Sequence, residues 1–168
     1  MAPAKLKSRL KKIKLLLLDI DGVLTDGRIL WIEGTGWTSF YSVKDGFGIK
    51  RLMKAGIEVG LISGGNFPSM RKRAEVLGLK HVYLGDENKI VPYEKIKAEF
   101  KLKDEEIAFV GDEIFDLPVL EKVGFSATVP NAPAEVKSSV HYITKTAGGF
   151  GAVREITDLI LHTSEHCK

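Results

Sequence analysis

The chain places two aspartates directly after four consecutive leucines, and this feature constrains its fold more than any other. Leu15–Leu18 is apolar at every position, which is typical of a parallel strand covered on both faces. Asp19 and Asp21 follow at once, and Gly22 allows the backbone to turn tightly. Open α/β sheets build their sites at the carboxyl ends of such strands, whereas unpaired charge is costly in a core. A solvated acidic loop is the alternative that this segment alone leaves open.

Apolar runs alternate with segments of helical periodicity along the rest of the chain. We expect further strands at 57–62, 81–84, 107–110 and 125–128, and helices near 46–54, 67–77, 89–100, 116–122 and 149–161. This alternation predicts an α/β fold with a doubly wound, Rossmann-like parallel sheet and right-handed crossovers. Because no linker or repeat interrupts it, we expect residues 1–168 to form a single domain.

Residues 27–44 break this rhythm. Two runs rich in aromatic and β-branched residues, 28–32 and 37–43, flank Glu33-Gly34-Thr35-Gly36. Such a pattern is typical of a β-hairpin, because glycine tolerates the positive φ of a tight turn. The hairpin is inserted immediately after the acidic loop, so we expect it to stand beside the site.

Composition limits the classes of partner and compartment. A net charge of +3 gives no reason to expect nucleic acid, and four leucines are far too short to span a membrane. The one cysteine, Cys167, cannot form an internal disulfide, which fits a cytoplasmic protein. The basic leader, residues 1–12, reads either as an amphipathic helix for a membrane surface or acidic partner, or as a frayed terminus. We expect the frayed terminus, and no signal peptide.

Polar residues follow three later strands in the same way. Ser63 and Gly64 follow one strand in a turn, Lys89 opens a helix after another, and Asp112 and Asp116 follow a third. Taken singly, each has an ordinary structural explanation, as a turn, a surface lysine or a helix cap. Since the carboxyl ends of the strands of a doubly wound sheet converge on one crevice, the combination indicates a common site.

This set of groups suits phosphoryl transfer. Carboxylate oxygens with open positions favour Mg²⁺, which prefers to share a substrate phosphate. A hydroxyl, backbone N–H groups and a lysine neutralise charge on phosphoryl oxygens. An aspartate can attack phosphorus to form an acyl phosphate, and a second carboxylate can protonate the leaving oxygen and then activate water.

The residues described above resemble, in chain order, the four motifs of the haloacid dehalogenase superfamily of aspartate-nucleophile phosphatases. Residues 26–28, 43–50 and 148–155 are similar to one branch, the phosphatases of 3-deoxy-D-manno-octulosonate 8-phosphate (KDO 8-phosphate), a precursor of lipopolysaccharide. Close relatives of that branch act on nine-carbon, sialic-type sugar phosphates. The resemblance implies a fold without a large cap domain, a Mg²⁺ cofactor and a homotetramer whose hairpins help to close the sites.

The resemblance also implies roles for the residues near the phosphoryl group. Asp19 would be the nucleophile and a Mg²⁺ ligand. Asp21 would be the general acid and base, contact the substrate and offer its main-chain carbonyl to the metal. Ser63, Gly64 and Lys89 would hold the phosphoryl oxygens.

Other roles follow from the same resemblance. Asp112 would bind Mg²⁺, and Asp116 would support the metal waters or Lys89. Lys44 stands where the branch commonly has arginine and would face the carboxylate of a sugar acid. Gly65 and Phe150 occupy positions at which relatives usually carry charged side chains, so the resemblance leaves open which sugar is bound.

Two other classes of protein use a similar fold. A phospho-accepting signalling receiver carries its phosphorylated aspartate on a middle strand, where this chain has Ser63. A non-catalytic binding protein would not need Asp19, Asp21, Lys89 and Asp112 together. We therefore expect an enzyme that hydrolyses KDO 8-phosphate, with a sialic-type 9-phosphate or another small sugar phosphate as the alternative substrate.

Overall fold

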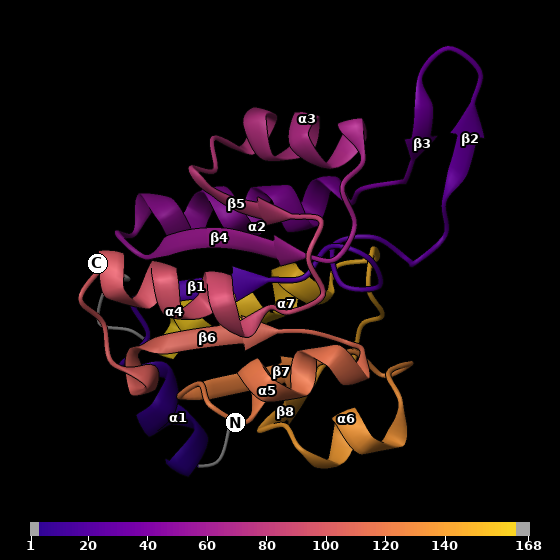
Figure 1. Ribbon diagram of the computed structural model, residues 1–168. Coiled ribbons are helices and arrows are strands. Elements are labelled where there is room, and N and C mark those ends of the chain that lie inside the picture. The colour runs from indigo at the N-terminus through magenta and orange to yellow at the C-terminus, as the bar shows by residue number, and fades with distance from the viewer. Residues whose placement is uncertain (1–3, 164–168) are drawn as a thin grey trace.

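The computed structural model describes residues 4–163 (Figure 1). Cys167, on which the expectation of a reducing compartment partly rests, lies outside the described residues. The strands are β1 (Leu15–Leu18), β2 (Leu30–Ile32), β3 (Gly36–Thr38), β4 (Glu58–Ser63), β5 (His81–Leu84), β6 (Ile107–Val110), β7 (Phe125–Thr128) and β8 (Tyr142–Ile143). Six of them form one parallel sheet in the order β5-β4-β1-β6-β7-β8. The expected doubly wound α/β class is confirmed.

Helices cover both faces of this sheet (Figure 1). They are α1 (Ala4–Leu10), α2 (Val43–Lys54), α3 (Pro68–Leu77), α4 (Ile90–Glu99), α5 (Leu117–Leu120), α6 (Ala134–Ser138) and α7 (Ala152–Thr163), with 3₁₀ turns η1 (Asp104–Glu106) and η2 (Ile114–Asp116). Helices α1, α2, α3 and α7 pack on one face, and α4, α5 and α6 pack on the other.

The four leucines of β1 explain why this strand lies at the centre. Leu16 and Leu18 belong to the core on the α2 and α7 side, whereas Leu15 and Leu17 belong to the core on the α4 and α5 side. All four are fully buried, and β1 pairs with β4 and β6 over its whole length. A strand buried on both faces has no polar side, which accounts for its uninterrupted apolar sequence.

The basic leader is a packed helix, and our expectation of a frayed terminus is wrong for residues 4–10. Leu10 is fully buried and Leu6 nearly so, and both join the core beside α7. Arg9 donates a hydrogen bond from Nη1 to the carbonyl of Gly124 at 2.8 Å. Lys5 and Lys7 on the same helix are exposed. The leucine spacing that suggested an amphipathic helix therefore serves the chain's own core.

Two short elements were not expected, and one expected boundary differs. Strand β8 leaves no sequence pattern, because a two-residue edge strand carries no measurable periodicity. Helix α6 is likewise too short to recognise. The hairpin is shorter than residues 27–44, since α2 already begins at Val43. The hydroxyl of Ser42 accepts a hydrogen bond from the Asp45 N–H at 3.4 Å and caps that helix.

The hairpin β2–β3 projects from the body of the molecule near the carboxyl ends of β1 and β4 (Figure 1). Trp31 and Trp37 pair across it, edge to face, with ring centroids 5.2 Å apart. Trp31 is 53% exposed and Trp37 is 41% exposed, and Ile29, Leu30 and Ile32 beside them are exposed too. The hairpin thus exposes apolar side chains on both of its faces. Among the helices of residues 4–163, none has the length and apolarity to cross a membrane.

Replacing Leu10 by alanine tests whether α1 is part of the core. Because Leu10 is fully buried, we expect Leu10→Ala to lower the free energy of unfolding by about 2–5 kcal/mol, measured by urea denaturation. The control is Lys11→Ala, an exposed neighbour whose replacement should change stability by less than about 0.5 kcal/mol. Equal, small effects of the two substitutions would show that α1 is not packed in solution.

Candidate active site

The first acidic loop leaves the carboxyl end of β1 and is held from several sides. Asp19 is 2% exposed, and its N–H donates to the Val110 carbonyl at 2.9 Å, so it continues the pairing with β6. The buried Thr25 hydroxyl accepts from the Gly22 N–H at 3.3 Å and donates to the Ile20 carbonyl at 3.3 Å. The loop therefore closes on itself and fixes the Asp19 and Asp21 carboxylates at the sheet edge.

Gly22 makes a close approach between two acidic loops possible. Its φ is +83°, and a Cβ atom there would lie 2.0 Å from Oδ2 of Asp112. Gly148 packs on the same loop, and its missing Cβ would lie 1.7 Å from the Gly22 carbonyl oxygen. Glycine at these two positions lets the Asp112 side chain and the Gly148 backbone approach the first acidic loop this closely.

The second acidic pair follows β6 and forms a tight turn. Asp116 in η2 is fully buried, and its Oδ2 accepts hydrogen bonds from the N–H groups of Asp112 at 2.9 Å and Glu113 at 3.1 Å. A Cβ on Gly111 would lie 2.5 Å from the same oxygen. Asp116 thus holds the backbone that carries Asp112, and this leaves the Asp112 side chain free to face Asp19.

Lys89 joins the two acidic segments. It stands at the start of α4 and is 1% exposed, with its Nζ 3.0 Å from Oδ1 of Asp19 and 2.5 Å from Oδ1 of Asp116. The Phe115 ring lies beneath the ammonium group, 4.6 Å from Nζ to the ring centroid. A buried lysine requires paired charge, and these two carboxylates supply it.

Ser63, Gly64 and Lys44 are the other residues that we expected at the site, and they lie on different elements. Ser63 ends β4 and is 2% exposed, and its Oγ accepts from the Gly65 N–H at 3.3 Å. Gly64 follows it in the turn toward α3. Lys44 lies in the first turn of α2 and is exposed, and no ion pair within residues 4–163 joins it to the aspartates. The structure therefore brings Asp19, Lys89, Asp112 and Asp116 together and does not join Lys44 to this cluster.

Burial raises the pKa values of the carboxyl groups at the site, and repulsion between neighbouring carboxylates adds to the effect. Burial raises the pKa of Asp19 to about 6, although Lys89 opposes the shift. Burial raises the pKa of Asp112 to about 8, and the negative charges of Asp19 and Asp116 add to this. Burial also raises the pKa of Asp21, again against the attraction of Lys89. Without a compensating cation, Asp112 favours its protonated form near neutral pH, and Asp19 keeps its proton to a higher pH than an ordinary aspartate does.

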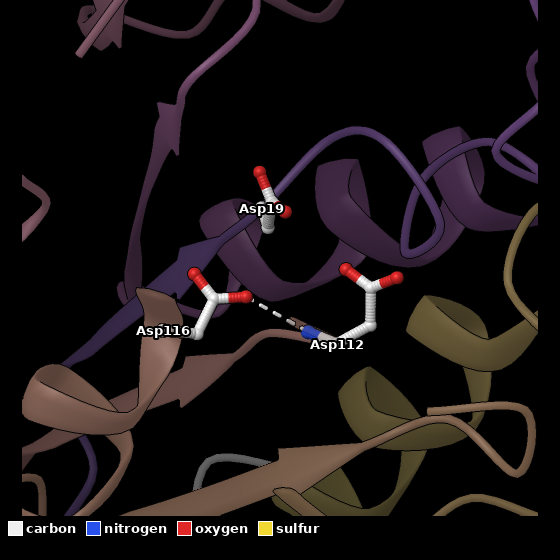
Figure 2. A group of neighbouring side chains, drawn as sticks. All are labelled: Asp19, Asp112 and Asp116. Carbon is white, nitrogen blue, oxygen red and sulfur yellow. Dashed lines mark hydrogen bonds between the residues drawn. The ribbon is translucent and has the colours of Figure 1, made fainter. Parts of the chain in front are cut away.

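The side chains of Asp19, Asp112 and Asp116 lie next to one another (Figure 2), and one oxygen of each lies within 4.8 Å of the others. Asp116 has both oxygens engaged, by Lys89 and by backbone N–H groups. Oδ1 of Asp112, in contrast, is buried and has no hydrogen-bond partner. Buried oxygens without a donor, in a cluster that repels itself, suit a hard divalent cation such as Mg²⁺.

Two features around the site were not assigned a role from the sequence. Asp45 is fully buried and accepts from the Arg154 N–H at 2.7 Å, so it joins the first turns of α2 and α7. Arg73 on α3 lies over the Tyr41 ring, with the guanidinium carbon 5.5 Å from the ring centroid, and donates to the Ser42 carbonyl at 2.9 Å. Contacts between residues this far apart in sequence leave no local pattern, and only a structure or an alignment reveals them.

Comparisons with known proteins identify the class. A model of the family described as haloacid dehalogenase-like hydrolase matches residues 39–124. The phosphatase KdsC of Yersinia pestis, named for 3-deoxy-D-manno-octulosonate 8-phosphate, is 38% identical over 153 residues, which cover 91% of this chain and 82% of that protein. KdsC of Escherichia coli K12 is 38% identical over 154 residues, which cover 92% and 82%. The chain belongs to the haloacid dehalogenase-like hydrolases, as the resemblance implied.

Solved structures place it close to one branch of that family. A phosphatase of the YrbI family from Pseudomonas syringae superposes with a TM-score of 0.94 at 40% identity, covering 98% of this chain and 93% of that one. The KDO 8-phosphate phosphatase of Moraxella catarrhalis, solved with magnesium, phosphate and KDO, superposes with a TM-score of 0.93 at 31% identity, covering 97% and 94%. The similarity therefore extends over nearly the whole of both chains.

The carboxyl cluster predicts an unusual dependence of stability on pH. The pKa values of Asp19 and Asp112 are higher in the folded chain than the ordinary 3.8, so the folded chain binds more protons than the unfolded chain. In EDTA we therefore expect their contribution to stability to be lost as pH rises from about 4 to 8. Between these pH values, the free energy of unfolding of Asp112→Asn should fall by less than that of wild type, the difference being at least about 1 kcal/mol. Urea denaturation at several pH values measures it.

Excess Mg²⁺ provides the second arm of this experiment. An ion held by the cluster favours the charged carboxylates and stabilises the folded chain, so the wild-type decline toward pH 8 should disappear. The same Mg²⁺ should leave Asp112→Asn almost unchanged. Parallel pH profiles for the two proteins in EDTA, or equal stabilisation of both by Mg²⁺, would contradict this account of the cluster.

Proposed function

We propose that the chain is a Mg²⁺-dependent phosphatase that hydrolyses KDO 8-phosphate to the free sugar acid and phosphate. The observation that carries this proposal is the buried Lys89, which pairs with Asp19 and Asp116 at the convergence of three strand ends. Relatives named for this reaction, 37–38% identical over most of the chain, support the substrate class. A relative that holds magnesium, phosphate and KDO supports the cofactor.

The proposed metal ligands are Asp19, Asp112 and the main-chain carbonyl of Asp21. Asp112 is fitted for this role because its Oδ1 is buried without a donor. Asp116 is not free to join, since its oxygens already hold Lys89 and the turn backbone, so it positions these groups. Bound Mg²⁺ supplies positive charge to the phosphoryl oxygens and to the clustered carboxylates.

The protein groups account for the bond changes. A carboxylate oxygen of Asp19 attacks phosphorus, and the bond from phosphorus to the sugar oxygen breaks as Asp21 donates its proton to that oxygen. Asp21 then removes a proton from the water that attacks the phosphorus of the acyl phosphate, which releases phosphate and restores Asp19. Lys89, the Ser63 hydroxyl and the N–H of Gly64 hold the phosphoryl oxygens throughout.

The sugar end of the site is where this chain departs from its branch. Lys44 is exposed at the first turn of α2 and is the proposed partner of the sugar carboxylate, but lysine lacks the fork of arginine. Gly65 and Phe150 supply no charge. A lost charge-assisted contact costs about 1.5–3 kcal/mol, so selectivity for a sugar acid should be weaker than in a relative with arginine at these positions.

Steady-state kinetics with three substrates test the substrate assignment. We expect KDO 8-phosphate to have the highest kcat/KM, followed by a sialic acid 9-phosphate and then a neutral hexose phosphate. Phosphate release is the readout, with Mg²⁺ and with EDTA. If the neutral hexose phosphate has the highest kcat/KM, the sugar-acid assignment is wrong. A sialic acid 9-phosphate in first place would instead favour the second candidate substrate.

Replacing the nucleophile tests the reaction class. Asp19→Asn should lower kcat by about 1,000-fold or more, because an amide is a poor nucleophile. Asp158→Asn is the matched control, since Asp158 pairs with Arg51 and Arg154 outside the aspartate cluster, and it should keep nearly full activity. An Asp19→Asn enzyme with more than a few per cent of wild-type turnover would contradict nucleophilic attack by Asp19.

We also propose that the chain acts as a homotetramer of single phosphatase domains in the cytoplasm. The support for assembly is the exposed apolar hairpin, which stands beside the site in a chain without a large cap domain. The sequence, with its single cysteine, supports a reducing compartment.

A charged residue on the hairpin tests the assembly. Wild type should scatter light as four copies of the 18.5 kDa chain, and Trp31→Glu should shift the population to smaller species with lower activity. Val76→Glu, which adds the same charge to an exposed site on α3, is the control and should leave the mass unchanged. A wild-type monomer with full activity at the assay concentration would rule out the proposed tetramer.

A further inference from the structure

The starts of α2 and α7 pack closely against each other. They lie within residues 43–50 and 148–155, which carry the sequence similar to one branch of the family but, apart from Lys44, have no part in the proposed reaction. A Cβ on Gly48 in α2 would lie 2.4 Å from Oγ1 of Thr157 in α7. The two segments therefore form one packed unit, and its contribution to the site requires an explanation.

Residues 148–151, the glycine turn, lie on the first acidic loop just before α7 begins. The Gly149 N–H donates a hydrogen bond to the Val23 carbonyl at 3.1 Å. A Cβ on Gly148 would lie 1.7 Å from the Gly22 carbonyl oxygen, so the two backbones are in direct contact. The glycine turn thus contacts the acidic loop at the residue that directly follows the proposed carbonyl ligand of the metal.

The chain is fixed on the entry side of the glycine turn by Glu155. Its Oε1 accepts from the Lys145 N–H at 3.0 Å, and its Oε2 accepts from the Thr146 N–H at 3.1 Å. These bonds join the first turn of α7 to the segment that precedes the glycine turn. The turn is therefore closed into a compact loop at the start of its own helix.

On the exit side, α7 receives its cap from another helix. The carbonyl of Gly151 accepts the helical hydrogen bond of the Glu155 N–H at 3.0 Å, but a glycine has no side chain to cap the first turn. Asp45 on α2 supplies the missing oxygen, since its Oδ1 accepts from the Arg154 N–H at 2.7 Å. A carboxylate at a helix N-terminus is favourable, because the N–H groups there carry partial positive charge.

The position of Asp45 on its own helix makes this contact notable. Ser42 caps α2, and Asp45 stands three residues later, where a capping-box side chain returns to the N–H of its own cap residue. The Asp45 carboxylate instead crosses to α7 and is fully buried there. Burial raises the pKa of Asp45, and the backbone N–H groups of Arg154 and Gly151 oppose the shift.

We propose that Asp45 is a positioning residue for the Mg²⁺ site, which acts by holding the glycine turn on the first acidic loop. Gly22 is the common contact, because it lies against Gly148 of the turn and against Oδ2 of Asp112. The position of the turn therefore sets how closely the Asp21 carbonyl and Asp112 approach each other. This inference rests on the proposed Mg²⁺ site.

Titration calorimetry with Mg²⁺ and the full chain, without substrate, tests this role. Asp45→Ala removes the acceptor for α7 and should raise the Kd for Mg²⁺ about tenfold, as loss of one buried hydrogen bond would. Asp45→Asn makes the same change of charge but keeps an oxygen that accepts from the Arg154 N–H. Its Kd should stay within about twofold of the wild-type value.

Asp158→Ala is the matched control. Asp158 joins the same two helices further along, through Arg51 at 2.7 Å and Arg154 at 2.8 Å, and does not contact the glycine turn. This substitution should leave the Kd for Mg²⁺ within about twofold of wild type. Thermal unfolding shows whether each variant is folded. If Asp45→Ala is not, Glu155→Ala releases the other side of the turn and should raise the Kd as well.

Three results would overturn the positioning role. They are a wild-type Kd in folded Asp45→Ala, equal losses in Asp45→Ala and Asp45→Asn, which would assign the effect to charge, and an equal loss in Asp158→Ala, which would assign it to general loosening of the two helices. Wild type that binds no Mg²⁺ would reject the metal site and this inference together. Wild type that binds Mg²⁺ but releases no phosphate from KDO 8-phosphate would contradict the proposed function alone.

Discussion

The ion pairs of Lys89 are the interaction on which the rest of the site depends. One ammonium group lies among four carboxyl groups, those of Asp19, Asp21, Asp112 and Asp116, and it pairs directly with only two of them. Charge is therefore not balanced by the protein alone. Either protons or a divalent cation must supply the remainder, and the raised pKa values of Asp19 and Asp112 express the same imbalance. When these carboxyl groups are ionised, the cluster therefore needs a divalent cation.

The scaffold can bear this concentration of charge because its other parts are firmly packed. The central strand β1 contributes apolar residues alternately to its two faces, and each face has its own buried core. Two glycines then let the loops approach where any side chain would collide, Gly22 against Asp112 and Gly148 against the Gly22 backbone. Rigid strands and close loops hold the carboxylates at fixed distances, as electrostatic stabilisation of a phosphoryl group requires.

Much of the fold was predictable because it depends on local patterns. The apolar run of Leu15–Leu18 identified a strand buried on both faces, and the polar residues after four strands identified the edge at which they converge. The family followed from the same motifs and is confirmed by the comparisons. The roles of individual residues stay predictions, although the structure does place Asp19, Lys89, Asp112 and Asp116 in contact range.

The features that the sequence did not disclose depend on contacts between distant segments. Leu6 and Leu10 looked like one face of a free amphipathic helix, because nothing local reveals that α7 covers them. Strand β8 has two residues and owes its existence to its neighbour β7. The contact of Tyr41 with Arg73 was not predictable either, since it joins the segment before α2 to α3. Such interactions are tertiary, and periodicity carries no information about them.

Covalent catalysis by Asp19 is the central step of the proposed mechanism, and chemical trapping of the acyl phosphate tests this step most directly. Borohydride added during turnover of KDO 8-phosphate with Mg²⁺ reduces an acyl phosphate, and thereby converts the modified aspartate to homoserine. Peptide mass spectrometry should then find homoserine at position 19 and nowhere else, and only when both substrate and Mg²⁺ are present. Turnover with an unmodified Asp19, or homoserine at Asp21 or Asp112 instead, would contradict the mechanism.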